Sequence, residues 1–272
     1  MQTWGGIAIV LCVSVLACGG AIQSSPDDGG AAKDASDADT TPVVDASPLG
    51  SLVFQRDNSA SGAPQFYGLF FSNAQQASGC APTTTIGACS AYTCGSTPPA
   101  GPYLGAGTLT LTTPQGSFAV TQSTQSQLGD YSFALPAPFT AGDVLGVSAS
   151  GGDVPAFAPV VVTAPGPITL SAPQPGTIST QQDLSWTWTL GEPNAKVSVE
   201  VMAFVPNATQ SVSCAFDATS GAGTMPASLL APLKGSNGML FWAQQRSTSY
   251  VAGTYPLQVT AVQMSSGSAT FQ

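Results

Sequence analysis

Leu184-Ser-Trp-Thr-Trp-Thr-Leu190 alternates large apolar side chains with hydroxyl side chains along its whole length. Successive side chains of a β-strand point to opposite faces of the sheet, so this period of two predicts a strand that buries Trp186 and Trp188 on one face. A turn signal, Gly-Glu-Pro-Asn194, follows the strand. The next run also alternates, and one of its faces is formed by Val197, Val199, Val201, Ala203 and Val205. We expect Glu200, which faces away from this row, to be a solvated strand residue.

The same pattern recurs through the chain after residue 50. Short alternating runs occur at residues 108–112, 131–135, 212–216 and 257–261. Charged residues make up only 7% of the chain, and Thr, Ser, Val, Gly and Pro are abundant, as is typical of extracellular all-β proteins. Only Ala227–Leu233 has the pattern of a helix, because Pro226 precedes it and Gly235 follows it. The expected fold class is therefore all-β.

A Pro- and Gly-containing stretch, Thr163-Ala-Pro-Gly-Pro167, divides the folded part into two units. We expect a β-sandwich-like domain over residues 51–165, which contain a cluster of cysteines, and a second β-sandwich domain over residues 166–272. A single sandwich built from both halves is the alternative. Both possibilities place the folded part after a signal peptide and an acidic linker.

The second unit resembles an immunoglobulin-like or fibronectin type III-like sandwich. The features that carry the resemblance are the Trp186-Thr-Trp188 strand, Cys214 on an inward face, and Gly253-Thr-Tyr255 at the start of a late strand. The position of Tyr255 is similar to that of a tyrosine corner, although no second strand cysteine follows it. The resemblance concerns architecture and implies little about function.

The chain begins with an apolar run from Ile7 to Ala17, which has the length of a signal-peptide core and is too short to span a bilayer. Its end, Val15-Leu-Ala-Cys18, resembles the lipobox of bacterial lipoproteins. The resemblance implies removal of residues 1–17, attachment of diacylglycerol to the thiol of Cys18, and acylation of its new amine by a fatty acid such as palmitate. Gly19 stands where an aspartate would retain such a protein at the inner membrane, so the resemblance implies the outer membrane. The alternative is an ordinary secretory signal and a secreted, non-lipidated β-protein.

Residues 18–50 link this anchor to the folded part. Six aspartates against Lys33 give the segment a net charge of −5, out of −9 for the whole chain. Gly, Ala, Ser, Asp and Pro dominate it, and such a composition buries too little apolar surface to offset the entropy of ordering. We expect a disordered linker, extended by its own charge, that holds the folded part away from the membrane.

Four cysteines remain once Cys12 is removed with the signal and Cys18 carries lipid; they are Cys80, Cys89, Cys94 and Cys214. An even number in an exported chain favours disulfides. The close spacing of the first three predicts one local bridge, with the third member either pairing with Cys214 or remaining free. Paired Cys-x-x-Cys spacings are missing, so we expect neither a zinc site nor any other cofactor.

The chain contains no histidine. It therefore lacks Ser-His-Asp and Cys-His arrangements and the usual general base near neutral pH. The remaining catalytic possibility is a carboxylate pair in a glycan-active hydrolase, for which the folded part offers Asp57, Asp130, Asp143, Asp153, Asp183, Glu192, Glu200 and Asp217. Nothing marks a pair, so we expect no catalytic residues and no enzyme. Four scattered basic residues on an acidic body argue against nucleic acid as a partner.

Aromatic side chains offer a binding alternative. One segment contains four of them, Phe66, Tyr67, Phe70 and Phe71. Most aromatic residues of a body this size belong in its core. Trp242, whose neighbours leave its face ambiguous, is the candidate binding aromatic. We expect a lipid-anchored protein of the bacterial cell envelope that acts in binding, adhesion or scaffolding, with a protein or glycan partner at the cell surface.

Overall fold

The computed structural model describes residues 49–58, 64–72, 82–95, 103–123, 129–189, 191–206 and 208–272. The fold in these ranges is all-β, as expected, with one α-helix, α3 (Ala227–Leu230), which continues as the 3-10 helix η2 (Ala231–Leu233), and a second 3-10 turn, η1 (Ala218–Ser220). None of the described helices is long and apolar enough to cross a membrane. The signal peptide, Cys18 and the acidic linker lie outside the described residues.

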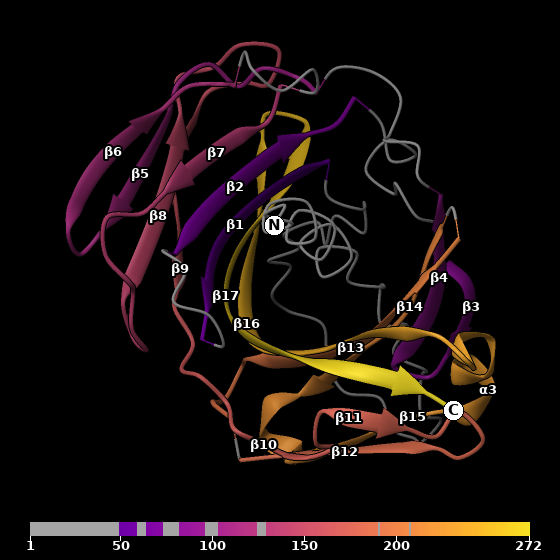
Figure 1. Cartoon of the computed structure of the whole chain (residues 1–272). Helices are drawn as coiled ribbons and strands as arrows, with labels where there is room; N and C mark the ends of the chain where they lie inside the picture. The colour runs from indigo at the N-terminus through magenta and orange to yellow at the C-terminus, as the bar shows by residue number, and fades with distance from the viewer. Residues whose placement is uncertain are drawn as a thin grey trace, which may run out of the picture.

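A large sheet, sheet A, curves through the molecule and forms its frame (Figure 1). Its strands follow one another in the order β3 (Pro82–Ile86), β4 (Cys89–Gly95), β14 (Ala208–Asp217), β13 (Lys196–Val205), β16 (Asn237–Ala252), β17 (Tyr255–Phe271), β1 (Gly50–Asp57), β2 (Gln65–Phe70) and β7 (Tyr131–Ala134). β11 (Gly176–Ile178) pairs with the end of β17. The β1–β17 and β11–β17 pairs are parallel, and the other pairs of sheet A are antiparallel.

Two smaller sheets pack on the convex side of sheet A, sheet B beside its β1, β2 and β7 end and sheet C beneath β13 (Figure 1). Sheet B has the strand order β6 (Gly116–Val120), β5 (Leu109–Thr113), β8 (Val144–Ala149) and β9 (Phe157–Thr163). Sheet C has the order β10 (Leu170–Ala172), β12 (Leu184–Trp188) and β15 (Ala222–Met225). Each sheet and the part of sheet A that faces it form one lobe, called here the sheet B lobe and the sheet C lobe.

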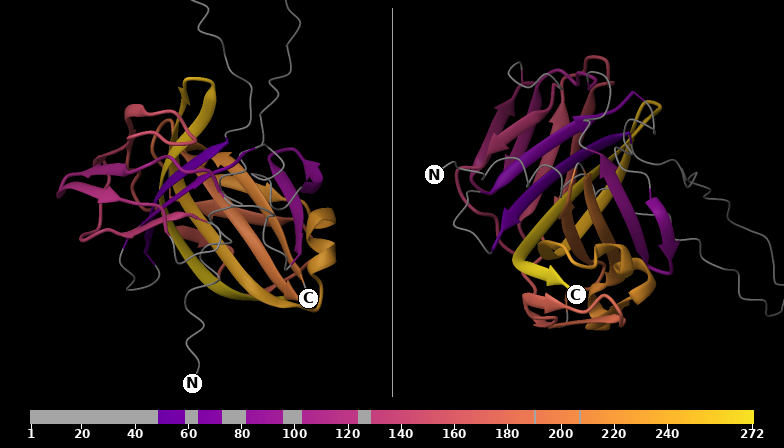
Figure 2. Two further views of the ribbon diagram at one scale, coloured as in Figure 1. Left: turned by 90° about the horizontal axis from the view of Figure 1, so that it is seen from above. Right: turned by 45° about the vertical axis from the view of Figure 1, so that its right-hand side comes forward.

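The β16–β17 hairpin joins the two lobes. Its strands are 16 and 17 residues long, about three times the usual length of a strand, and Figure 2 shows them running past both lobes. β13 pairs with residues 238–245 of β16 near one end, and β1 pairs with residues 257–264 of β17 near the other. The boundary expected at residue 165 falls between β9 and β10, but strands from both sides of it enter sheet A. The two halves therefore share one continuous sheet.

The core of the sheet B lobe comes from alternate positions on facing strands. Leu109 and Leu111 of β5 are fully buried, whereas Thr110 and Thr112 between them are exposed, as the alternation predicts. Opposite them lie fully buried side chains of sheet A, including Leu52, Phe54, Phe66, Phe70 and Val259. Phe66 and Phe70 are thus core residues, as expected.

The core of the sheet C lobe contains the residues from which the fold was first predicted. Trp186 and Trp188 are buried, and the row of apolar side chains on β13 from Val197 to Ala203 packs against them. The indole nitrogen of Trp188 donates a hydrogen bond to the carbonyl oxygen of Ala218 at 3.0 Å. Leu190 lies outside the described residues. α3 and η2, where the sequence predicts a helix, cover this core with Leu229, Leu230 and Leu233.

Tyr255 fastens the ends of three strands. Its hydroxyl lies within hydrogen-bond distance of the carbonyl oxygens of Leu49, at 2.7 Å, and Phe71, at 3.0 Å, next to the ends of β1 and β2, and its single proton is shared between them. A tyrosine corner reaches only a few residues upstream, whereas these partners are 206 and 184 residues away in sequence. The resemblance therefore extends to the position of Tyr255 and not to its contacts.

The connection between the lobes is itself held against sheet A. Gln263 of β17 donates from its side-chain nitrogen to the carbonyl oxygen of Pro165 at 2.6 Å. Glu192 accepts a hydrogen bond from the backbone N–H of Gly166 at 2.8 Å and forms an ion pair with Arg246 at 2.9 Å. These contacts fix the direction in which the chain passes from one lobe to the other.

Candidate binding face

Sheets B and C both cover the convex side of sheet A, which leaves its concave side without a described strand packed on it (Figure 1). Successive side chains of a strand point to opposite faces of the sheet. The core residues of the two lobes point to the convex side of sheet A, so the residues between them along each strand point to the concave side. On this concave face lie Val53, Gln55, Tyr67, Ser198, Glu200, Met202, Ser211, Met239, Phe241, Ala243, Val262 and Met264.

The concave face has an apolar centre of its own. Its buried members are Val53, Met202, Phe241, Ala243, Val262 and Met264, and the partly buried Tyr67 and Met239 pack against them. All eight side chains belong to sheet A, and none comes from sheet B or C. Three of the chain's five methionines lie here. Methionine is flexible and polarisable, and surfaces that bind protein partners often use it.

Glu200 interrupts this apolar centre. It stands on β13, directly opposite Ser213 of β14 and Phe241 of β16. It is 0% exposed, and neither carboxylate oxygen has a hydrogen-bond partner in the described part of the chain. The prediction of a solvated Glu200 is therefore wrong. The side chain faces away from the valine row as expected, but sheet A curves around that side, and alternation alone does not show which faces are buried.

Burial raises the pKa of Glu200 from 4.5 to about 8. The cause is desolvation, since a charged carboxylate is costly in an apolar environment. The nearby Ser211 hydroxyl lowers the pKa by a smaller amount, although it makes no hydrogen bond of ordinary length to the carboxyl group. Glu200 is therefore mostly neutral at pH 7 and is able to donate one hydrogen bond as well as accept others.

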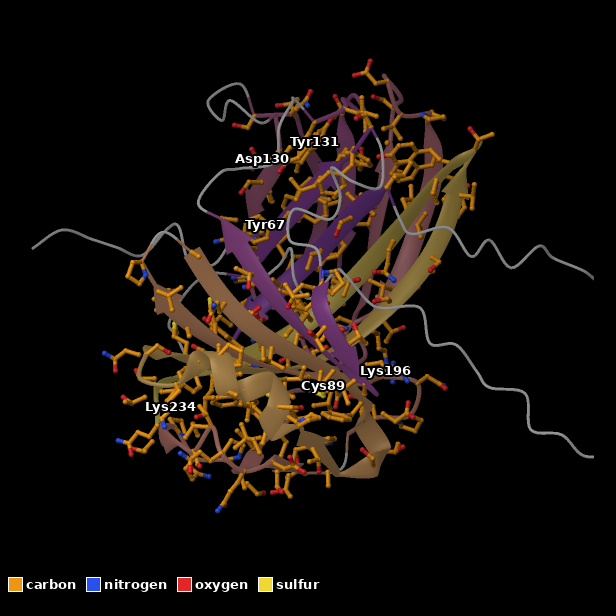
Figure 3. All side chains as sticks on the ribbon, turned by 90° about the vertical axis from the view of Figure 1, so that its right-hand side faces the viewer. Tyr67, Cys89, Asp130, Tyr131, Lys196 and Lys234 are labelled. Carbon is orange, nitrogen blue, oxygen red and sulfur yellow. A yellow bond between two sulfur atoms is a disulfide. The ribbon has the colours of Figure 1, made fainter. Side chains whose placement is uncertain are left out.

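Further unpaired acceptors share this face. The side-chain oxygen of Gln55 on β1 and the hydroxyl of Ser211 on β14 are buried without a hydrogen-bond partner among the described residues. At the margin, burial and the charge of Asp130 raise the pKa of Tyr67, and Figure 3 shows these two residues in the sheet B lobe. Buried polar atoms are nearly always paired in native proteins. Glu200, Gln55 and Ser211 thus place four such atoms beside the apolar cluster, while the side chains of Trp186, Gln210, Gln244, Arg246 and Gln263 hold others elsewhere in the described structure.

Five of the other acids have structural roles. Asp143, Asp153 and Asp183 accept hydrogen bonds from the backbone N–H groups of Thr140, Gly105 and Ala227. Asp217 pairs with Lys196 at 2.6 Å, and the contacts of Glu192 are given above. These acids hold turns and the connection between lobes in place.

Two other acids lie on the strands of the concave face, Asp217, which pairs with Lys196, and Asp57. The alternation of β1 places it on the same side as Val53 and Gln55. β1 and β13 are separated by β17 and β16, so Asp57 and Glu200 lie three strand spacings apart, about 14 Å along the sheet. Glycosidase carboxylates are roughly 5–10 Å apart. Glu200 and Asp57 are therefore too widely spaced for that chemistry.

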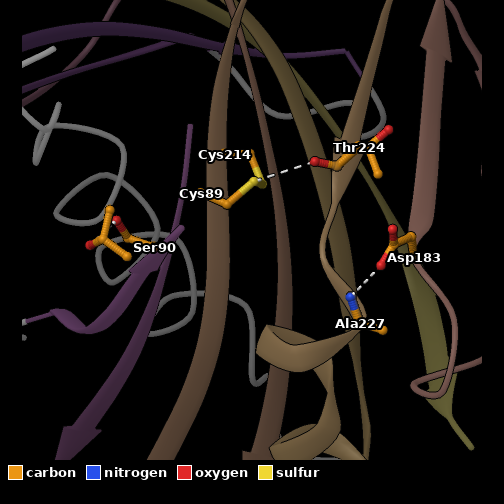
Figure 4. The surroundings of a disulfide bond; sticks show 7 residues. Cys89, Ser90, Asp183, Cys214, Thr224 and Ala227 are labelled. Atoms are coloured by element: carbon orange, nitrogen blue, oxygen red, sulfur yellow. Dashed lines mark hydrogen bonds between the residues drawn. A yellow bond between two sulfur atoms is a disulfide. The ribbon is translucent and has the colours of Figure 1, made fainter. Parts of the chain in front are cut away.

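A disulfide joins two adjacent strands of sheet A. Cys89 of β4 and Cys214 of β14 are a cross-strand pair with a Cα–Cα distance of 4.0 Å, on the side that faces the sheet C core. Figure 4 shows the sulfur of Cys89 close to the carbonyl oxygen of Thr224, at 3.6 Å. A disulfide sulfur has no hydrogen to donate, so this is a packing contact. The bridge is the expected alternative in which Cys214 pairs with a member of the cysteine cluster.

Cys94 is also disulfide-bonded, and Cys80 lies outside the described residues. Cys94 and Tyr92 are buried together on the side of β4 opposite to Cys89. The described part of the chain contains no group of three or more His, Cys, Asp and Glu side chains that could hold a metal ion.

Trp242 and Phe241 point to opposite sides of β16. Trp242, the aromatic residue singled out in the sequence, is partly exposed and packs against the sheet C core together with Leu240. Phe241 is the aromatic residue that lies in the apolar centre of the concave face. This distinction could not be predicted from the sequence, because Phe241 and Trp242 each follow an apolar neighbour.

Comparisons with known proteins give no family for this chain. No protein-family model matches it, and no curated protein matches it. Among solved structures, the tetra-tandem repeat in the extending region of a large adhesion protein is 15% identical, with a TM-score of 0.23, over 82% of this chain and 49% of that one. The chain thus spans about half the length of that structure. We draw neither fold nor function from a similarity of this size.

Proposed function

We propose that this chain is an envelope lipoprotein, anchored through Cys18, whose concave face binds a protein partner. The observation that carries the proposal is Glu200, a buried carboxyl group that has no hydrogen-bond partner among the described residues and lies at the centre of an apolar, methionine-containing face. A polar group left unpaired in a protein interior costs free energy. Such groups are concentrated at functional sites, where a ligand supplies the missing hydrogen bonds.

The chemistry of the face specifies the kind of partner. Within the described part of the chain, Gln55 and Ser211 each present one oxygen without a hydrogen-bond partner and Glu200 presents two, so the partner offers hydrogen-bond donors. Val53, Met202 and the other apolar side chains require an apolar complement. The backbone N–H groups and apolar side chains of a protein segment provide both. A role in binding also accords with the wide spacing between Glu200 and Asp57 on the described strands.

The anchor rests on sequence alone. Val15-Leu-Ala-Cys18 supports lipidation, and two or more acyl chains give stable attachment where one gives reversible attachment. Attachment to the outer membrane would restrict the partners to proteins of the envelope.

Photo-crosslinking in cells tests the binding face. A photoreactive amino acid placed at Met239 or Tyr67, both partly buried at the concave face, should yield a discrete crosslinked envelope protein. The matched control is Tyr250, which is 38% exposed on the same hairpin, beside Phe157 of sheet B, and should yield none. The substitution Glu200→Leu in the Met239 background, which removes both carboxyl oxygens, should reduce the yield. Equal yields at Met239 and Tyr250, or a crosslink only to glycan, would contradict a protein partner on this face.

A further inference from the structure

β3 is the one described strand in which every residue is exposed. It forms the outer edge of sheet A and pairs only with β4 on its inner side. A bulge between Pro82 and Thr84 bends its start, and Thr84, Thr85 and Ile86 keep a regular register with Ala91, Ser90 and Cys89. An exposed edge strand offers unpaired backbone N–H and C=O groups to another strand.

The other sheet edges make side-chain contacts or are short. Phe118 of β6 and Phe133 of β7 are in contact, with ring centroids 5.5 Å apart, and this contact closes one side of the sheet B lobe. Thr248 of β16 donates a hydrogen bond to the backbone oxygen of Val161 on β9 at 3.0 Å, on the opposite side of that lobe. β10 and β11 have three residues each and β15 has four. β9, with seven residues, and β6, with five, are edges of greater or equal length, and β3 differs from them in that every one of its residues is exposed.

The β3–β4 hairpin has no charged residue to protect its edge, although Pro82 and the bulge protect the start of β3. Natural edge strands commonly carry lysine or another charge that prevents pairing with a second sheet. Residues 82–95 contain no Asp, Glu, Lys or Arg, although the chain as a whole has a net charge of −9. Nothing in the hairpin itself therefore repels a second copy of the same hairpin.

The sequence of β3 allows two copies of this strand to pair with each other in antiparallel orientation. Pro-Thr-Thr-Thr-Ile is nearly symmetrical about Thr84. If two copies pair about a two-fold axis at Thr84, threonines face threonines, and Pro82 of each copy faces Ile86 of the other. Thr–Thr pairs across strands are stabilising, and Ile86, which is 41% exposed, gains apolar contact. An isologous interface of this kind is the commonest in homodimers.

The hairpin is also held firmly enough to present this edge. The Cys89–Cys214 disulfide links β4 to β14 next to the turn that joins β3 to β4. Gly87 in that turn has φ +57, which a two-residue hairpin connection requires and glycine adopts without strain. The β3 edge is therefore already ordered in the single chain, so pairing with a second copy does not cost the entropy of ordering it.

We propose that two copies of this protein associate through antiparallel pairing of their β3 strands, which joins their two large sheets into one. The proposal depends on the β3 edge alone and is independent of the concave face and of lipidation. Since the pairing involves about five residues on each side, the dimer should be weak and should form at high local concentration.

Cysteine crosslinking of the mature protein tests the geometry. Under mild oxidation, Thr84→Cys should give a disulfide-linked dimer, because the two-fold axis brings residue 84 of both copies together. The matched control is Thr112→Cys, on an exposed position of β5 within sheet B, which should give much less dimer at the same protein concentration. Similar yields from both variants, or no dimer from Thr84→Cys, would overturn the proposal.

Sedimentation measurements provide a second test without a new cysteine. Wild-type protein should show a monomer–dimer equilibrium, and Thr84→Lys should raise the dissociation constant at least about tenfold by placing two like charges at the axis. Thr112→Lys should leave the constant unchanged. A wild type that stays monomeric throughout the concentration series, or a dimer that tolerates Thr84→Lys, would show that β3 does not pair in this way.

Discussion

Glu200 and Phe241 occupy directly opposite positions on β13 and β16, and both lie on the concave face of sheet A. Phe241 belongs to the apolar centre of that face, and Glu200 is fully buried without a hydrogen-bond partner in the described structure. A carboxyl group beside a phenyl ring and methionines is expensive to ionise. The stability of the protein should therefore respond to the protonation of this one residue.

The first prediction concerns pH. The pKa of Glu200 is raised from 4.5 to about 8 in the folded protein, so the native state keeps a proton that the unfolded state releases between these values. The free energy of unfolding should be highest below about pH 4.5, decrease as the pH rises, and reach its lower limit above pH 8, a loss on the order of 3–5 kcal/mol. Urea denaturation at a series of pH values measures it.

Glu200→Gln is the matched control for this prediction, because glutamine has the same shape and does not titrate. The difference in unfolding free energy between wild type and variant should change steadily from pH 4.5 to pH 8. Histidine usually dominates titration in this pH range. The chain has no histidine, so no histidine obscures the pH dependence that Glu200 causes. A difference that stays constant with pH would mean that Glu200 is ionised and solvated at neutral pH.

The second prediction concerns the disulfide. Cys89 and Cys214 are 125 residues apart in sequence, and closing so long a loop restricts the unfolded chain strongly. Replacing both with serine should lower the free energy of unfolding by about 4 kcal/mol. Guanidinium denaturation of the double variant and the wild type, both with the other cysteines intact, measures the loss. Unchanged stability would show that the loop is already restricted by other contacts in the unfolded state.

The third prediction concerns the hydroxyl of Tyr255. Tyr255→Phe keeps the ring and removes the hydrogen bonds to Leu49 and Phe71, which should cost about 1–2 kcal/mol. Tyr250→Phe, at an exposed tyrosine on the neighbouring strand, should be nearly neutral. Thermal unfolding of the two variants makes the comparison, and equal melting temperatures would assign no role to the Tyr255 hydroxyl.

The fourth prediction concerns the anchor. The intact mass of the protein from the membrane fraction should equal that of Cys18–Gln272 plus acyl chains, and Cys18→Ser should release the protein from the membrane. An unmodified mass that begins at another residue would instead indicate a secreted or periplasmic protein. The binding face and the β3 edge would be unaffected by that result.

The alternation of apolar and polar residues along the sequence predicted the strands that bury one of their two faces. Trp186 and Trp188 on β12 and Leu109 and Leu111 on β5 are buried as expected, and the short helix begins at Ala227. In these segments each side chain's environment follows from its neighbours two positions away. The all-β class could therefore be recognised from a few residues.

Pairing between distant strands could not be predicted in this way. β1 pairs in parallel with β17, so that Gly50 lies opposite Leu257, and no local pattern indicates a partner some two hundred residues away. The division at residue 165 rests on Pro and Gly in a connection, which do not show that strands on both sides of it enter the same sheet. The burial of Glu200 depends on the curvature of that sheet and was missed for the same reason.

Oxidative footprinting of the concave face is the most direct test of the binding proposal. The oxidation rates of Met239 and Tyr67 would be compared between intact outer membranes and the purified full-length protein, with exposed Tyr250 as the internal reference. A partner on the concave face should slow the oxidation of Met239 and Tyr67 several-fold in the membrane and leave Tyr250 unchanged. Equal rates for all three residues in the two samples would contradict a partner at this face.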